Sequence, residues 1–350
     1  MSKSIQIATY IVLVHISTLF PSDVKATELD VPFPELFLEE FEDKGISVDG
    51  DDFLLNDPVP LEPEESIFSV LDGTQQYISS GVEYMAKNID EFFSSEQALY
   101  DTSKSYLKLT QNLVWSEGGE SEASSNVSFK LRLPYTKRKL HFTFESNKGE
   151  DSTENQAQLE NTKNISDEDK IYSAGIQAER EGKNGWKVKT SIGIDLKSTL
   201  DLFTRFRLSR EFKFNDWSIN WQETPYWYNS FGWGFDSSLE LNNKITDKDL
   251  FRSSLLARWK EETDYFELSQ VFRMFHTLSK KKALSYYVGV YGLSEPILYS
   301  THYLIGINYR ENIHKDYLFA EIVPQILYQR INDFRPEYSI LFRVEMVFKK

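Results

Sequence analysis

Hydrophobic and polar residues alternate along the chain from Ser105 to its end. The final segment, "YSILFRVEMVFKK", shows this most clearly, because every second residue is hydrophobic: Tyr338, Ile340, Phe342, Val344, Met346 and Phe348. The positions between them include Ser339, Arg343 and Glu345. Successive side chains of a β-strand point to opposite faces, so this pattern predicts a long strand with one apolar and one polar face.

About fourteen such segments follow one another. They begin near residues 105, 125, 138, 170, 185, 199, 216, 229, 249, 264, 282, 297, 316 and 337. Many run for ten or more residues, whereas soluble strands usually have about 5–6 and tilted transmembrane strands need roughly 9–11. Aromatic residues near the segment ends suit the girdles of a membrane barrel, namely Trp186, Trp217, Trp259, Tyr309 and Phe348. The pattern predicts an all-β protein: a transmembrane, antiparallel, up-and-down β-barrel over residues 104–350.

Loop lengths give a second indication of the same architecture. The connections "PYTKRK" and "EGKNG" are short and fall on the side of the two termini, while "SEGGESEAS" and the acidic stretch after Ser146 are long and fall on the opposite side. Short turns on one side and longer loops on the other are typical of outer-membrane barrels. The connections "DLKST" and "KEETD" are short on the longer side, so twelve or sixteen strands remain compatible with the sequence.

The first residues predict export across a membrane. Lys3 precedes an apolar run over residues 5–20, and Val24 and Ala26 stand where a signal peptidase expects small residues. A membrane-anchoring helix is the alternative, but it needs roughly 20 apolar residues. We therefore expect residues 1–26 to be a signal peptide.

Residues 27–103 differ from the rest in charge. They hold 20 Asp and Glu against 2 Lys and Arg, and they account for the net charge of −15. This acidity argues against nucleic-acid binding through phosphates. An amphipathic helix is expected at about residues 66–93, weakened near Gly73, because apolar residues recur at spacings of three and four: Ile67, Val70, Leu71, Tyr77, Ile78, Val82, Met85, Ile89 and Phe92.

The chain resembles uncharacterised outer-membrane proteins of proteobacteria. The stretches "IDEFF", "SYLKL", "YFELSQVFRMFHTLS" and "FAEIVPQILYQRINDFRPEYS" carry the resemblance. It implies a barrel in the outer membrane, surrounded by lipid and lipopolysaccharide, with both termini in the periplasm. It also implies recognition by the barrel-assembly machinery through the terminal strand, although Lys349 and Lys350 follow its last aromatic residue. The residues concerned are Phe342, Val344, Met346 and Phe348.

The sequence offers little for catalysis or metal binding. It has no cysteine, and after removal of the signal peptide its histidines are His141, His276, His302 and His314, none in a catalytic motif or at metal-ligand spacing. No glycine-rich phosphate loop is present. We expect no cofactor, no metal and no enzymatic activity, with a barrel hydrolase as the least favoured alternative.

The polar face of the strands carries many charges, which must point inward because a Lys or Arg facing mid-membrane lipid costs about 2–4 kcal/mol. Two interpretations stay open: a hydrated pore whose charges select solutes, or a filling of ion pairs that makes the wall rigid. The predicted inward charges are Lys130, Arg132, Glu145, Lys187, Lys189, Arg205, Arg207, Asp236, Arg252, Arg258, Glu267, Arg273, Glu321, Arg343 and Glu345.

Two functions agree with this pattern. The first is a porin-like channel for small hydrophilic solutes, with part of residues 27–103 as a plug, since large barrels can be closed in this way. The second is a structural or surface barrel without transport, whose N-terminal segment binds a periplasmic partner. A disordered N-terminal segment is the third alternative for that region.

Overall fold

The computed structural model describes residues 85, 88–89, 92–93, 105–118, 121–132, 139–146, 171–182, 185–196 and 200–349. They belong to one compact unit, Ile67–Lys350. The predicted signal peptide, the acidic segment and most of the helix expected at residues 66–93 lie outside the described residues. None of the described residues belongs to a helix with the length and apolar character needed to cross a bilayer.

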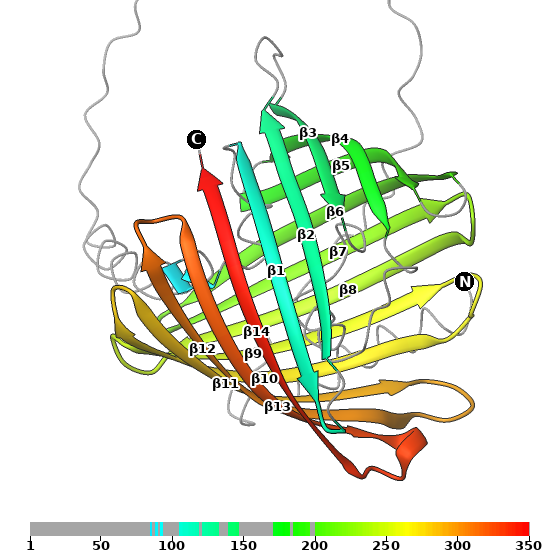
Figure 1. Ribbon diagram of the computed structural model, residues 1–350. Coiled ribbons are helices and arrows are strands. Elements are labelled where there is room, and N and C mark those ends of the chain that lie inside the picture. The colour runs from blue at the N-terminus through cyan, green and yellow to red at the C-terminus, as the bar shows by residue number, and fades with distance from the viewer. Residues whose placement is uncertain are drawn as a thin grey trace, which may run out of the picture. The chain divides into compact units, whose positions relative to one another are not determined.

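Fourteen antiparallel strands form one closed barrel, in which each strand pairs with its neighbours in the sequence and β1 pairs with β14 (Figure 1). The predicted fold and strand number are therefore confirmed. The strands are β1 (Tyr106–Ser116), β2 (Ser121–Arg132), β3 (Lys139–Ser146), β4 (Tyr172–Glu181), β5 (Trp186–Leu196), β6 (Leu200–Phe214), β7 (Trp217–Tyr228), β8 (Gly232–Lys244), β9 (Asp249–Lys260), β10 (Phe266–Ser279), β11 (Lys282–Leu293), β12 (Tyr299–His314), β13 (Leu318–Gln329) and β14 (Pro336–Lys349), with a short 3-10 helix, η3 (Arg330–Asn332), before β14.

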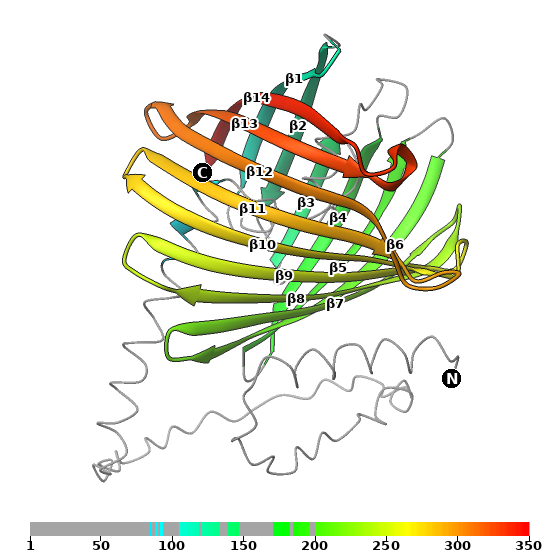
Figure 2. The same cartoon turned by 90° about the horizontal axis from the view of Figure 1, so that it is seen from below.

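The first and last strands close the cylinder along their full length. Their register runs from Tyr106 opposite Lys349 to Ser116 opposite Ser339. Because the strand number is even, β1 begins and β14 ends at the same end of the barrel, which we call the terminal end. The opposite end, the loop end, carries the connection between β3 and β4 and the turn that contains η3. Figure 2 shows the curved wall of paired strands from a second direction.

The two faces of the wall differ as the alternation predicts. In β12, the side chains of Tyr303, Ile305 and Ile307 are exposed on the outside, whereas Leu304 and Arg310 point inward and are fully buried. The other strands repeat this arrangement, and most of their exposed side chains are large and apolar. A wall that is apolar outside and polar inside is the architecture of a membrane-spanning barrel.

Glu223 of β7 is an exception on the outer face. It lies near mid-strand on the side of Trp221, and the opposite residue in β8 is Ser237. One carboxylate oxygen, Oε1, accepts hydrogen bonds from Trp221 Nε1 at 2.5 Å and from Ser237 Oγ at 2.8 Å. Lipid offers no such donors, so these two neighbours provide the hydrogen bonds of Oε1, while the buried Oε2 has no hydrogen-bond partner among the described residues.

Candidate functional site: the inner wall

The predicted inward charges all occupy positions on the inner face. Nine of them are buried: Lys130, Glu145, Lys189, Arg205, Asp236, Arg252, Arg273, Glu321 and Glu345. Arg132 is exposed at the terminal end of β2. The other five are partly buried: Lys187, Arg207, Arg258, Glu267 and Arg343. The inner wall is therefore charged around most of its circumference, with the inward positions of β7 and β11 as uncharged intervals.

Several of these charges meet beside the seam between β1 and β14. Arg310 of β12 pairs with Glu321 of β13, and its Nη1 lies 2.6 Å from Glu345 Oε2 of β14. Lys108 of β1 pairs with the other oxygen of Glu345 at 3.0 Å. Arg310 and both carboxylates are almost wholly buried. Buried charges are tolerated only when they are paired in this way, so the cluster joins four adjacent strands.

Arg343 extends the cluster across the seam. Its Nη1 lies 3.2 Å from Glu321 Oε2, and its Nε donates a hydrogen bond of 2.9 Å to Asn112 Oδ1 of β1. The first and last strands are thus connected by side chains as well as by backbone pairing. The five charged groups named here are three cations and two carboxylates.

A second polar cluster lies toward the loop end on the opposite wall. Arg258 of β9 donates two hydrogen bonds to Asp236 of β8, at 2.8 and 2.6 Å. Tyr226 donates a third bond to the same carboxylate at 3.2 Å, and Arg205 Nη2 donates to the phenol oxygen of Tyr228 at 2.5 Å. This two-pronged arginine–carboxylate geometry fixes both side chains. The aromatic rings here pack together over the inner surface of β6 and β7.

Part of the inner wall is apolar, which differs from the expected charged or wet interior. Buried apolar side chains form a continuous arc across the inward faces of β10 to β14, bordered by Val114 of β1: Val271, Tyr287, Tyr291, Leu304, Val323, Leu327 and Leu341. The sequence pattern did not predict this arc, because the stretches "YLIGI", "EIVPQIL" and "SILF" do not alternate between apolar and polar residues. They are nearly continuous apolar runs. Such runs indicate strands that are apolar on both faces.

Residues from the N-terminal region contact the inner wall at the terminal mouth of the barrel. Met85 and Ile89 pack against Leu250 of β9 and Phe275 of β10, all four being buried. Met85, Asn88, Ile89 and Phe92 are helical. Leu250 and Phe275 face inward close to the terminal end of their strands, so the helical residues lie within the mouth.

Aromatic contacts hold the same segment in place. The ring of Phe92 meets Phe319 of β13 edge-on at 5.9 Å, and Phe93 meets Phe275 at 5.3 Å. Arginines lie on the rings of the wall: Arg310 is 4.3 Å from the centre of Phe319. Aromatic pairs of this kind contribute ~0.5–1.5 kcal/mol each beyond the area they bury.

Sequence reasoning missed Arg310 and Lys108, which complete the seam cluster. Both could have been found, because each has the same parity as the polar residues of its strand: Arg310 follows His302, Gly306 and Asn308 at even positions. The ion-pair partners of Arg310 and Lys108 could not be predicted from sequence, since the pairing of Arg310 with Glu345 depends on the register of two further strands.

No protein-family model matches this chain, and no curated protein sequence matches it. Solved structures with similar chain traces include three bacterial proteins. The KdgM porin in complex with disordered oligogalacturonate has a TM-score of 0.35 and 10% identity, covering 69% of this chain and 99% of that chain. OpdK of Pseudomonas aeruginosa with vanillate has a TM-score of 0.43 and 7% identity, covering 71% and 98%. The outer-membrane channel DcaP of Acinetobacter baumannii has a TM-score of 0.42 and 9% identity, covering 70% and 96%.

Identities and TM-scores of this size say nothing about the solute of this chain. Its class follows instead from its own structure: fourteen strands, closure between β1 and β14, and exposed apolar side chains around the outside. The chain is a closed fourteen-stranded antiparallel β-barrel with an apolar outer face, which is the architecture of a membrane-spanning barrel.

Proposed function

We propose that this barrel is a channel for small hydrophilic solutes whose N-terminal region closes the terminal mouth. The observation that carries the proposal is the packing of Met85 and Ile89 on Leu250 and Phe275, inside a wall that carries buried charges on most of its strands. A structural barrel needs no separate segment across its mouth. A channel that must not leak does need one.

The chemistry of the wall supports polar solutes. Arg205, Arg252 and Arg273 present cations from the inner faces of three strands, while Asp236 and Glu145 present carboxylates. Charged rings on an inner wall set which solutes pass. Among the described residues, the contacts at the mouth are apolar, since Met85 and Ile89 meet Leu250 and Phe275.

A filled structural barrel is the second candidate, favoured by how deeply the inward charges are buried. Lys130 and Glu345 are each 1% exposed, and Arg310 is 0% exposed. In that case the interior holds no continuous water path, and the N-terminal segment is an arm for a periplasmic partner.

Single-channel conductance distinguishes the two candidates. The processed protein and a variant lacking residues 27–100 are each inserted into planar bilayers, and swelling of liposomes in small sugars is measured in parallel. The channel proposal predicts low conductance for the complete chain and a large increase after deletion. Equal conductance of the two proteins, with no sugar entry in either, supports the filled barrel.

Orientation and assembly belong to the same proposal. β1 begins and β14 ends at one end of the barrel, which we assign to the periplasm because the exported chain is threaded from that side. Phe342, Val344, Met346 and Phe348 face outward on β14, where assembly factors and lipid can reach them. The proposal assigns no catalytic residue and no cofactor.

A further inference from the structure

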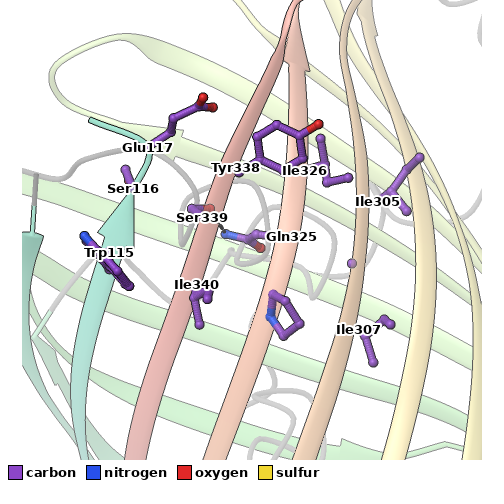
Figure 3. Close-up of a pocket in the computed structure, with 12 residues that line it drawn as sticks. Trp115, Ser116, Glu117, Ile305, Ile307, Gln325, Ile326, Tyr338, Ser339 and Ile340 are labelled. Atoms are coloured by element: carbon purple, nitrogen blue, oxygen red, sulfur yellow. Dashed lines mark hydrogen bonds between the residues drawn. The ribbon is translucent and has the colours of Figure 1, made fainter. Parts of the chain in front are cut away.

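A groove crosses the outer face of β12, β13, β14 and β1 (Figure 3). Its volume is about 640 Å³, and its lining is almost entirely apolar. The side chains that form it include Trp115, Ile305, Ile307, Pro324, Tyr338 and Ile340. Sites of roughly 300–1,000 Å³ commonly hold small ligands. The groove lies on the face that contacts the membrane, so the ligand available to it is the alkyl chain of a lipid or another amphiphile.

The wall behind the groove lacks part of its backbone pairing. Between β12 and β13 the paired positions run to Gly306 opposite Gln325 and resume at Tyr309 opposite Ile322. The two positions between are unpaired, and one of them places Ile307 opposite Pro324. Proline has no N–H, so it cannot donate to the neighbouring strand. Prolines are rare in central strands for this reason.

The inner side of the same stretch is apolar in part. Leu304, Val323 and Leu341 line it, at 0%, 5% and 2% exposure, and they belong to the apolar arc of the inner wall. Two polar side chains lie at the break on the inner side. Gln325 accepts a hydrogen bond from Tyr287 at 3.1 Å and donates one to Ser339 at 3.2 Å, and Asn308 donates one to Glu321 at 3.3 Å. Gly306 adds no side chain to the thickness of the wall.

A second proline, Pro225, allows the break at Pro324 to be compared with another break in the same barrel. Pro225 of β7 interrupts its pairing with β6 in the same manner, between Arg205 opposite Tyr226 and Leu208 opposite Glu223. The inward residues there include Arg205, Arg207 and Thr224 beside the aromatic rings of Phe203 and Tyr226. An interrupted ladder is therefore common to both sites, whereas the apolar arc of the inner wall lies only behind Pro324 of the two.

We propose that the break at Pro324 is a lateral port, through which the alkyl chain of a single-chain amphiphile moves between the outer groove and the apolar arc inside the barrel. The port goes beyond the channel function, because it connects the interior with the membrane and not with either aqueous side. Water-soluble solutes keep their path along the barrel axis.

The port is tested by photolabelling. The complete protein is reconstituted in vesicles that contain a long-chain fatty acid with a diazirine on its alkyl chain, and labelled peptides are identified by mass spectrometry after illumination. The proposal predicts adducts on the outward residues Ile307 and Ile340 and on the inward residues Leu304 and Leu341. Adducts on the outer residues alone overturn it, because they mean that the groove is a dead end.

A disulfide lock separates the port from entry through the barrel mouths. The chain has no cysteine of its own, so the double variant Ile307→Cys/Pro324→Cys forms a single defined bridge across the break. We expect the inward adducts to be lost in the oxidised variant and to return after reduction, while the outward adducts persist. The matched variant Phe206→Cys/Pro225→Cys should leave the inward adducts unchanged. Inward labelling that survives the first bridge contradicts the proposal.

Discussion

The phenol of Tyr287 lies directly over Gly306 on the neighbouring strand. A methyl group built on this glycine would stand 2.3 Å from the Tyr287 oxygen and 2.4 Å from the ring carbon that bears it. The two residues are cross-strand partners in β11 and β12, and the phenol also donates a hydrogen bond to Gln325. The glycine thus provides the space in which a buried tyrosine is fixed on the inner wall.

Gly306→Ala should therefore destabilise the barrel. Tyr287 is 4% exposed and cannot swing aside freely, and overpacking of this kind costs about 1–3 kcal/mol. Urea unfolding of the protein in vesicles measures the change. Gly182→Ala is the control, because its nearest neighbours lie at 3.5 Å, an ordinary contact distance. Equal stability of the two variants would show that Tyr287 is not held as described.

Arg310→Met should be among the most destabilising single changes in the wall. It removes the cation that Glu321 and Glu345 share, and only Arg343 and Lys108 then pair with the two buried carboxylates. Breaking a buried ion pair by removing one partner typically costs ~3–5 kcal/mol.

The control for Arg310 is Lys213→Met, which breaks a more exposed pair. Lys213 Nζ lies 3.8 Å from Glu211, and both side chains are about one-third exposed. Pairs of that kind contribute about 0–1 kcal/mol. Urea midpoints that shift equally for the two variants would contradict the central role of Arg310.

The strands were predictable from sequence because their period is local. The fourteen expected starts lie within four residues of the observed ones, and the inward charges follow from parity alone. The seam was not predictable: Arg343 and Asn112 are 231 residues apart in the chain, and their contact exists only because the barrel closes. The apolar arc was not predictable for another reason. Leu304 and Ile305 are adjacent and both apolar, so the sequence does not show that the inner face of the strand is apolar as well.

Ile89→Ser should open the terminal mouth. It removes the apolar contact with Leu250 and Phe275 and places a hydroxyl in that cluster. We expect the single-channel conductance to rise toward that of the variant lacking residues 27–100. Asn88→Ser changes the adjacent exposed residue and should leave the conductance as it is. A rise in both variants, or in neither, would mean that the packing of Ile89 does not close the mouth.

Glu223→Gln should stabilise the barrel in a lipid bilayer. Glutamine keeps an acceptor for Trp221 and Ser237 but brings no charge to the lipid face, where a mid-membrane Lys or Arg costs about 2–4 kcal/mol and an acidic residue costs less. The reciprocal change, Gln270→Glu, adds a carboxyl group on the same outer face, where Gln270 now bonds Ser253 at 2.9 Å. Unfolding in vesicles should show opposite shifts for the two variants, and shifts of the same sign would contradict this account of the outer wall.

Closure of the barrel is tested most directly by a disulfide between its first and last strands. Leu113 of β1 and Phe342 of β14 are register partners on the outer face. In the cysteine-free chain, Leu113→Cys/Phe342→Cys should oxidise within one molecule and migrate faster in denaturing gels until reduced, whereas Leu113→Cys/Phe348→Cys, which is out of register, should not. Bridges that form only between molecules, or equally in both variants, would show that the strands do not close into this cylinder.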